Sequence, residues 1–245
     1  MNWRAWRRSW LTEPLYRMAR DAMPSLSPTE QEAIEAGDVW WDAQLFSGNP
    51  DWQELLDVEP ASLTPAEQAF LEGPVAELCS KLDDWSISWE QYDLSPDVWA
   101  FLKRHGFFGM IIPTEYGGLG FSAYAHSEVV RRISVRSVTA AVTVMVPNSL
   151  GPGELLMQFG TQDQRDYWLP RLAQGQEIPC FGLTSPAAGS DAASMTDTGV
   201  VCRQQVGGVE TLGMRLNWRK RYITLSPVAT VLGLAFKLSD PDHLL

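Results

Sequence analysis

The chain has 245 residues, of which 45% are hydrophobic and 11% aromatic, so it can bury a core and is not a mainly disordered protein. Its 30 acidic and 19 basic residues give a formal net charge of −11, which argues against nucleic acid as a partner. The sequence contains no run of about 18 uncharged apolar residues, so we expect no transmembrane helix.

Residues 1–20 differ in charge from the rest of the chain. They contain five arginines and one acid, Glu13, a net charge of +4, and Trp3, Trp6 and Trp10 lie among the arginines. Trp and Arg together suit a membrane interface. Three roles stay open for this basic Trp/Arg arm: a solvated arm, a contact with the membrane surface on the inner face of the cell membrane, or a targeting segment.

The cysteines and histidines show neither metal-ligand nor disulfide spacing. We therefore expect no metal site. We interpret the three cysteines as reduced core residues of a cytoplasmic protein: Cys79, Cys180 and Cys202.

Two helix starts share one pattern, in which a Ser or Thr cap is followed by Pro and, at the third helical position, by Glu. The pattern occurs at residues 27–30 and 64–67, and each copy can form a capping box. The second copy opens an apolar-periodic helix, which we expect Gly73 and Pro74 to break early.

Helices are also predicted on both sides of an irregular loop. Ser95 caps a helix that ends near Gly106, and Ser122 begins the next one. Between them, residues 113–120 contain three glycines in four positions, which allow a close approach of the backbone.

Residues 138–146 are almost wholly apolar, and we expect a core helix that is buried on all sides. A short helix follows Gly153. A further capping box at Thr161 opens the last predicted helix, which Gly175 closes.

After residue 176 the pattern changes to short apolar segments bounded by Pro and Gly. We expect strands in residues 178–184, 200–202, 212–216, 222–224 and 230–236. Helices followed by strands indicate the α+β class. We divide the chain into an N-terminal extension, a helical domain and a β domain, at residues 1–60, 61–176 and 177–245.

A turn of small residues follows the first predicted strand. Thr184 ends the strand, Pro186 rigidifies the turn, residues 187–190 leave backbone amides uncovered, and Asp191 can cap it. Exposed amides and a Ser hydroxyl suit phosphate oxygens or a flavin carbonyl. Turns of this kind also occur as purely structural elements.

Residues 181–191, Phe-Gly-Leu-Thr-Ser-Pro-Ala-Ala-Gly-Ser-Asp, resemble the signature of the acyl-CoA dehydrogenase family. Four further segments resemble family motifs in the family's order: residues 113–120, 148–151, 159–164 and 167–175. Within the family, the Trp-rich N-terminal part and residues 180–191 are most similar to the large bacterial long-chain fatty acyl-CoA dehydrogenases of β-oxidation.

The resemblance implies a fold and an activity. The family has an N-terminal all-α domain, a middle β-barrel-like domain and a C-terminal helical bundle, with FAD between the last two. This chain would then hold the helical domain and an incomplete β domain, without the bundle. The implied reaction is the FAD-dependent α,β-dehydrogenation of a long-chain fatty acyl-CoA to trans-2-enoyl-CoA. The implied partners are electron-transfer flavoprotein or a similar acceptor and, when complete, further copies in a homo-oligomer.

The resemblance also implies roles for individual residues. The cofactor-binding positions would be Phe181, Leu183, Thr184, Gly189, Ser190, Tyr222 and Thr224. Thr184 and Thr224 would bond to the flavin ring, with Tyr222 in the place of a family Trp. Ser190 and Val146 would contact the substrate. Ser185 departs from the family, which has Glu there.

The family's catalytic Glu lies in the C-terminal bundle, which we expect beyond Leu245, so we assign no catalytic residue. The chain alone is expected to be an inactive N-terminal fragment. Two alternatives stay open: a relative of acyl-CoA oxidases, and a non-catalytic membrane-surface or interaction module on the same fold.

Overall fold

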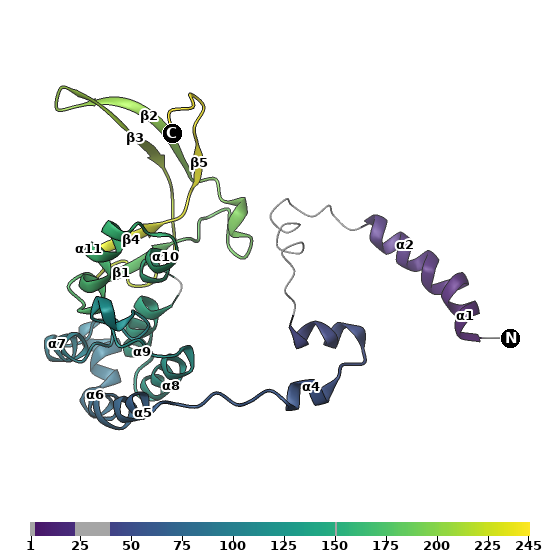
Figure 1. Ribbon diagram of the computed structural model, residues 1–245, viewed down its shortest axis with the longest axis horizontal. Helices are drawn as coiled ribbons and strands as arrows, with labels where there is room; N and C mark the ends of the chain where they lie inside the picture. The colour runs from purple at the N-terminus through teal and green to yellow at the C-terminus, as the bar shows by residue number, and fades with distance from the viewer. Residues whose placement is uncertain (1–2, 23–39, 150) are drawn as a thin grey trace. The chain divides into compact units, whose positions relative to one another are not determined.

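The computed structural model describes residues 3–22, 40–149 and 151–245, and the chain divides into two compact units, Met1–Glu59 and Pro60–Leu245 (Figure 1). The second unit has helices followed by strands, so the expected α+β class is confirmed. Among the helices in these ranges, none has both the length and the apolar content needed to cross a membrane.

The first unit begins with one helical segment, which consists of α1 (Trp3–Arg7), a π-helical turn (Arg8–Thr12) and α2 (Glu13–Ala22). The π-helical turn ends two residues before Pro14, which has no N–H to donate and whose ring would clash with the carbonyl four residues earlier in a regular α-helix. The amide of Glu13 donates instead to the carbonyl of Arg8, five residues back. The wider turn therefore carries the helix past the proline.

A small cluster around Trp41 completes the described part of this unit. A 3₁₀-helix (Trp41–Ser47) and α4 (Trp52–Leu56) bring the rings of Trp41 and Trp52 to a centroid distance of 5.0 Å. Trp41 is buried, and its Nε1 donates to the carbonyl of Asp51 at 2.6 Å. The capping box expected at residues 27–30 lies outside the described residues.

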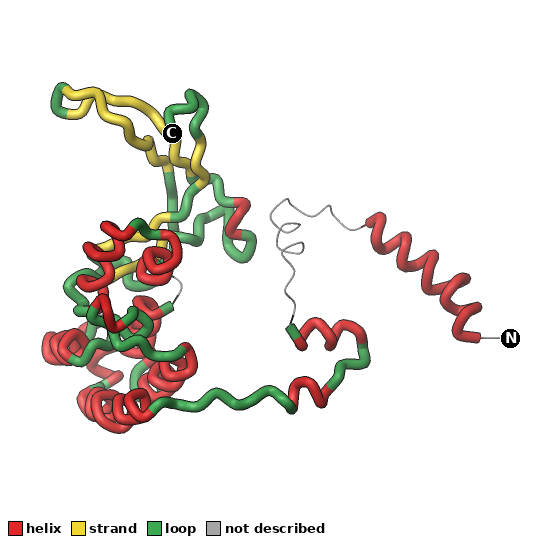
Figure 2. The backbone as a smooth tube through the Cα atoms, viewed as in Figure 1, coloured by secondary structure: helices red, strands yellow, loops and turns green. Residues whose placement is uncertain are grey.

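The helices of the second unit, red in Figure 2, are α5 (Pro65–Phe70), α6 (Ala76–Lys81), α7 (Pro96–Arg104), α8 (Ala123–Ser134), α9 (Val138–Met145), α10 (Pro152–Phe159) and α11 (Gln162–Ala173). Four of these helices begin directly after the cap residues that the sequence predicts. Thr64 and Thr161 complete capping boxes, and the side chains of Ser95 and Ser122 each accept an amide hydrogen bond. Local sequence thus determines where these helices begin.

Gly73 and Pro74 do not end their helix, so that expectation is wrong. Pro74 lies inside a π-helical turn, Leu71–Val75, through which α5 continues into α6. A further π-helical turn, Ser86–Gln91, precedes α7. At Pro74, as at Pro14, the wider turn accommodates a residue that has no backbone donor.

The helices enclose one large apolar cluster, which extends from α5 to α9 and includes Ile178 at the start of the β part. Phe101, Phe107 and Phe108 are among its largest fully buried side chains. The expected close backbone approach is present in the glycine loop beside it. A Cβ on Gly118 would lie only 2.0 Å from the carbonyl oxygen of Ile112, so only glycine fits there.

A buried carboxylate, that of Glu67, joins the starts of two helices. Its two oxygens accept the amides of Thr64 at 2.8 Å and Ser122 at 2.7 Å, which cap α5 and α8. Burial by itself raises the pKa of Glu67, but the hydrogen bonds from Ser122 and Thr64 outweigh it and lower the pKa to about 2. Glu67 is therefore ionised and fixes α5 against α8.

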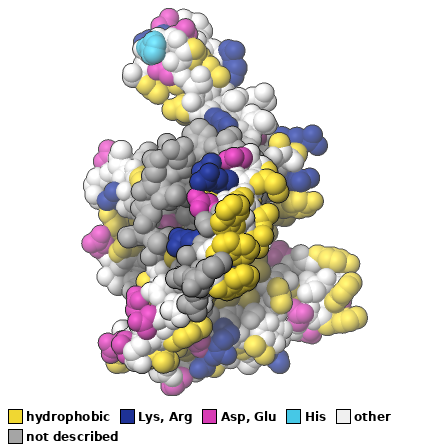
Figure 3. Space-filling model, turned by 90° about the vertical axis from the view of Figure 1, so that its right-hand side faces the viewer, with side chains coloured by type: hydrophobic (Ala, Val, Ile, Leu, Met, Phe, Trp, Pro, Cys, Tyr) yellow, Lys and Arg dark blue, Asp and Glu magenta, His cyan; other side chains and the backbone are white. Residues whose placement is uncertain are grey.

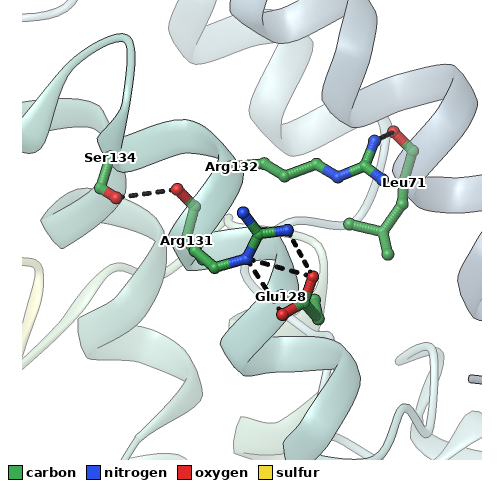
Figure 4. A network of polar contacts seen from close by, with 5 residues as sticks. All are labelled: Leu71, Glu128, Arg131, Arg132 and Ser134. Carbon is green, nitrogen blue, oxygen red and sulfur yellow. Dashed lines mark hydrogen bonds and ion pairs between the residues drawn. The ribbon is translucent and has the colours of Figure 1, made fainter. Parts of the chain in front are cut away.

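The contact between α8 and the π-helical turn Leu71–Val75 includes polar groups (Figure 4). Arg132 donates to the carbonyl of Leu71 at 3.5 Å, whereas the neighbouring Arg131 turns back along its own helix to Glu128 at 2.7 Å. Ser134 donates to the carbonyl of Arg131 at 2.9 Å. Arg132 thus links α8 to the π-helical turn, whereas the adjacent Arg131 bonds within its own helix.

The β part contains two small sheets. In one, β1 (Pro179–Gly182) pairs parallel with β4 (Val231–Leu234). In the other, β2 (Thr198–Val206) pairs antiparallel with β3 (Val209–Asn217) and parallel with β5 (Lys237–Ser239). A 3₁₀-helix, Ala192–Ser194, precedes β2. The strands do not close into a barrel within residues 151–245.

Several strand predictions differ from the structure. The strand predicted at 230–236 is shorter, Val231–Leu234, and β5 lies outside every predicted strand. The first strand ends at Gly182 and not at Thr184, because the amide of Leu183 turns back to the carbonyl of Phe181 at 3.1 Å. Residues 222–224 form no strand, because Tyr222 has a φ of +58°, in the left-handed region.

The expectation that α9 is buried on all sides is wrong. Val138 is 65% exposed, and the face that it shares with Val142 borders a cavity.

The three cysteines are free; Cys180 is buried, and Cys79 and Cys202 are half-buried.

Candidate functional site

Two segments that the sequence singles out lie side by side in the β part. The ammonium of Lys220 donates to the carbonyl of Leu183 at 3.0 Å, and the amide of Arg221 donates to the carbonyl of Thr184 at 3.1 Å. Two consecutive residues on one segment thus hold two consecutive residues on the other. The structure therefore brings Leu183 and Thr184 next to the segment that carries Tyr222 and Thr224.

A buried ion pair supports this junction. Lys220 Nζ lies 2.6 Å from Asp197 Oδ2, and the two side chains are 2% and 3% exposed. The hydrogen bond from Lys220 lowers the pKa of Asp197 against the opposing effect of burial, so the carboxylate is ionised. A fixed negative charge thus balances the buried ammonium.

The turn after Thr184 exposes backbone donors. Ser185 and Ala188 exchange amide–carbonyl hydrogen bonds at 3.0 and 3.2 Å, which closes the turn. Beyond it Gly189 and Ser190 are exposed, and within residues 151–245 their amides have no protein acceptor. The hydroxyl of Ser185 is buried and, in this same part of the chain, finds no partner. The turn thus offers free donors to a polar ligand.

Tyr222 has an unusual backbone and an unusual position. It is 82% exposed, and the Arg221 guanidinium lies 5.0 Å from the centroid of its ring. Bulky residues rarely adopt a left-handed φ, and such strain concentrates at ligand sites. The consequence is an aromatic face directed away from the core, directly after the junction with Thr184.

A cavity of about 570 Å³ lies between α9 and the residues that follow Tyr222. It is lined by Tyr92, Asp93, Trp99, Val138, Thr139, Val142, Thr143, Thr224, Leu225, Pro227 and Val228. The exposed residue Thr224 thus borders a largely apolar space.

The other predicted residues lie close to these elements. Val146 is half-buried at the start of a 3₁₀-helix, Val146–Asn148, four residues after Val142 and so on the same face. Phe181 is half-buried in β1 opposite Gly233. Its Cδ2 lies 3.0 Å from the position that a Cβ on Gly233 would take. Phe181 therefore packs across β4.

Sequence reasoning missed Asp197, Lys220, Val142 and Thr143. Lys220 lies in the run 219–221, whose three basic residues suggest a solvated surface. The sequence contains no signal for which of them is buried, because its partner is 23 positions away. Val142 and Thr143 were hidden in an apolar run that favoured a core role.

Comparison with known proteins identifies the helical part. The family profile described as "Acyl-CoA dehydrogenase, N-terminal domain" matches residues 64–176. The mitochondrial very long-chain specific acyl-CoA dehydrogenase of Rattus norvegicus is 32% identical over 183 residues, which is 74% of this chain and 28% of that protein. An acyl-CoA dehydrogenase of Bacillus subtilis is 28% identical over 170 residues, 69% of this chain and 40% of that one.

A solved structure, described as an FAD complex of PigA, has the same fold. It matches with a TM-score of 0.62 and 25% identity over 76% of this chain and 46% of the PigA chain. This chain thus spans less than a third of the rat relative and less than half of PigA.

Proposed function

We propose, from the match of residues 64–176 to the N-terminal domain of acyl-CoA dehydrogenases, that the chain belongs to this family and forms the flavin-facing and acyl-facing part of an FAD-dependent acyl-CoA dehydrogenase. The proposed reaction is the α,β-dehydrogenation of a long-chain fatty acyl-CoA to trans-2-enoyl-CoA. The observation that carries the proposal is the junction of Leu183 and Thr184 with Lys220 and Arg221, which holds them beside the segment that carries Tyr222 and the cavity-lining Thr224.

The residues at this junction fit FAD. The exposed amides of Gly189 and Ser190 suit phosphate or carbonyl oxygens, and Thr224 offers a hydroxyl at the edge of the cavity. The exposed ring of Tyr222 suits stacking on a planar heteroaromatic ring. FAD would supply the redox chemistry, and the chain would bind and orient it.

The cavity beside α9 fits an alkyl chain. Val138, Val142 and Val228 give it apolar walls, and burial of each methylene of a ligand contributes about 0.8 kcal/mol. Val146 lies one turn further along the same face, outside the lining of the cavity; by the family resemblance, a small apolar side chain there would admit a longer acyl tail. These features support a fatty acyl substrate and, as the finer proposal, a long-chain one.

The remaining parts of the proposal rest on the family. Residues 61–176 and 177–245 would form two domains, electron-transfer flavoprotein or a similar carrier would accept the electrons, and the complete enzyme would be a homo-oligomer. A positioned Glu carboxylate would take the α-proton, and residues 1–245 provide no carboxylate that we assign to this step.

An FAD titration of the purified chain tests the proposal. We expect binding to quench flavin fluorescence, and we expect Thr184→Val and Thr224→Val each to weaken it about tenfold by loss of a hydrogen bond. Ser226→Ala is the matched control, because Ser226 is exposed and close to Thr224. Absence of binding, or equal effects of all three changes, contradicts the proposal. In turnover assays with a long-chain acyl-CoA, peroxide release would indicate an oxidase instead.

A second proposal concerns the helix at residues 3–22, which we propose as a peripheral contact with anionic phospholipid on the cytoplasmic side of the membrane. No described side chain of α2 is buried, and apolar residues of the helix are more than half exposed: Trp3, Trp10, Leu11, Leu15 and Met18. On the face of the molecule drawn in Figure 3, hydrophobic side chains lie beside both basic and acidic ones. Aromatic rings among arginines match a headgroup layer.

The π-helical turn strengthens this second proposal. Trp6 precedes the π-helical turn and Leu11 lies within it. The two residues are five positions apart and would diverge on a regular α-helix, and the wider turn brings their side chains closer to one face. Leu15 and Met18 follow Leu11 at spacings of four and three. The apolar residues before and after the π-helical turn thus contribute to one apolar face of the helix.

Vesicle sedimentation tests the contact. We expect binding to phosphatidylserine-containing vesicles, weaker binding to pure phosphatidylcholine, and release by salt. Trp3→Ala/Trp10→Ala should reduce binding, whereas Trp52→Ala, an exposed Trp on another helix, should not. Binding that survives deletion of residues 1–20 would show that the helix is not the contact.

A further inference from the structure

We propose that the buried Asp197–Lys220 pair is a positioning device, which fixes the segment that carries Tyr222 and Thr224 relative to Leu183 and Thr184. Its purpose would be to hold the candidate flavin contacts in one geometry. This inference rests on the proposed FAD-binding function and adds two residues to it, neither of which would touch the cofactor.

Lys220 is saturated by groups from three places in the chain. Its ammonium donates to Asp197 Oδ2 at 2.6 Å and to the carbonyl of Leu183 at 3.0 Å, and Met195 Sδ lies 3.9 Å away. The side chain is 2% exposed, so water does not compete for these bonds. A buried ammonium has a strong requirement for its acceptors, and Leu183 is therefore held to Lys220.

Asp197 is equally saturated. Its Oδ1 accepts the amide of Arg219 at 2.7 Å, and its carbonyl accepts the amide of Lys237, at the start of β5, at 2.9 Å. The carboxylate thus binds both the side chain of Lys220 and the backbone one residue earlier. It fixes the position and the direction of this segment where it leaves β3.

The effect continues into the candidate site through the next two residues. The amide of Arg221 donates to the carbonyl of Thr184 at 3.1 Å, and Tyr222 then takes its left-handed φ of +58°. A strained residue keeps such a backbone only when its surroundings determine it. The hydrogen bonds to Asp197, Leu183 and Thr184 are the surroundings that fix the backbone before Tyr222.

A buried ion pair is a poor choice for stability alone, because apolar residues of similar volume often stabilise a core as well or better. The pair adds a fixed orientation of the segments that it joins, because hydrogen bonds constrain angles and apolar contacts do not. Stability and positioning can therefore be separated by variants of the pair.

The decisive variant is Asp197→Asn/Lys220→Met. It removes both buried charges, so no unpaired charge is left, and the Asn oxygen can still accept the amide of Arg219. The donor to the carbonyl of Leu183 is lost. Lys220→Arg is the conservative variant, and Arg203→Gln/Glu210→Gln removes an exposed ion pair on neighbouring strands as a matched control.

Two readouts on the 245-residue chain test the proposal. Without FAD, we expect amide exchange of the double variant to accelerate in residues 181–184 and 219–224 but not in β2 and β3. With FAD, we expect at least a tenfold loss of affinity and a shifted flavin absorption band, with partial recovery in Lys220→Arg. The control pair should behave as the unaltered chain in both.

The outcomes separate this inference from the proposed function. Unchanged exchange and unchanged FAD affinity in the folded double variant would overturn the positioning role and leave the proposed function intact. If the unaltered chain binds no FAD, the proposed function fails, and the inference fails with it as a statement about a flavin site. Thermal melting of each variant establishes that it is folded, so a loss of affinity at unchanged stability supports positioning.

Discussion

The helical and β parts of the second unit are held together in different ways. The helical part has a large apolar cluster with fully buried aromatic rings, and Glu67, a strongly buried carboxylate, caps two of its helices. In the β part, β3 is exposed along its whole length, and the buried Asp197–Lys220 pair joins the segments. Apolar burial thus builds a scaffold, whereas directed polar contacts arrange the candidate site beside it.

Truncation of the apolar cluster is expected to have the largest effect. Phe107 is fully buried, so Phe107→Ala should lower the free energy of unfolding by about 3–5 kcal/mol through lost burial and a cavity. Phe159→Ala, on a ring that is 76% exposed, should change it by no more than about 0.5 kcal/mol. Urea unfolding measures both, and similar losses would contradict a core centred on Phe107.

Next in size is the loss of one partner of the buried pair. Lys220→Met leaves the Asp197 carboxylate buried without its counter-charge and should cost about 3 kcal/mol. Arg203→Met breaks an exposed pair with Glu210 and should cost less than about 1 kcal/mol. A small loss for Lys220→Met would show that the β part does not depend on its polar junction.

The carboxylate of Glu67 should make the helical part sensitive to acid. Its pKa of about 2 in the folded chain lies below the ordinary 4.5, so its contribution is complete above about pH 4.5 and disappears as the pH falls to about 2. Glu67→Gln should cost about 2 kcal/mol at pH 7, because one amide loses a charged acceptor.

Unfolding of the Glu67→Gln variant and the unaltered chain across this range checks the sign. The difference in stability between them should shrink as the pH falls from 5 to 2. A difference that stays constant or grows would mean that Glu67 is not ionised between the two helix caps.

The smallest effect is expected on the exposed strand. Met214 is 53% exposed in β3, so Met214→Ser should change the free energy of unfolding by about 0.5 kcal/mol or less. The midpoint of urea unfolding measures it. A loss above about 2 kcal/mol would show that this face is covered, and the contrast between the two parts would then weaken.

Features set by neighbouring residues could be predicted from the sequence. The capping boxes at Thr64 and Thr161 need only a hydroxyl and an acceptor three positions on, and both are present. The glycine loop at residues 113–120 was likewise visible, because glycine permits backbone approaches that a Cβ would block. The order of helices and strands follows from such local signals.

Features that depend on distant partners could not be predicted in this way. Residues 222–224 have a strand-like composition, but the anchors at Lys220 and Arg221 redirect the backbone at Tyr222. Glu67 was visible as a cap for its own helix, whereas its bond to Ser122, 55 residues away, was not. Pro74 looked like a helix breaker because a π-helical turn leaves no clear mark in sequence.

The central claim is that FAD binds where residues 181–190 meet residues 218–224. Hydrogen–deuterium exchange of the chain with and without saturating FAD tests it most directly. We predict that FAD slows exchange in these two segments and along the cavity face of α9, and leaves α5, α6 and β3 unchanged. Protection elsewhere, with none at the amides of Gly189, Ser190 and Tyr222, would contradict the account.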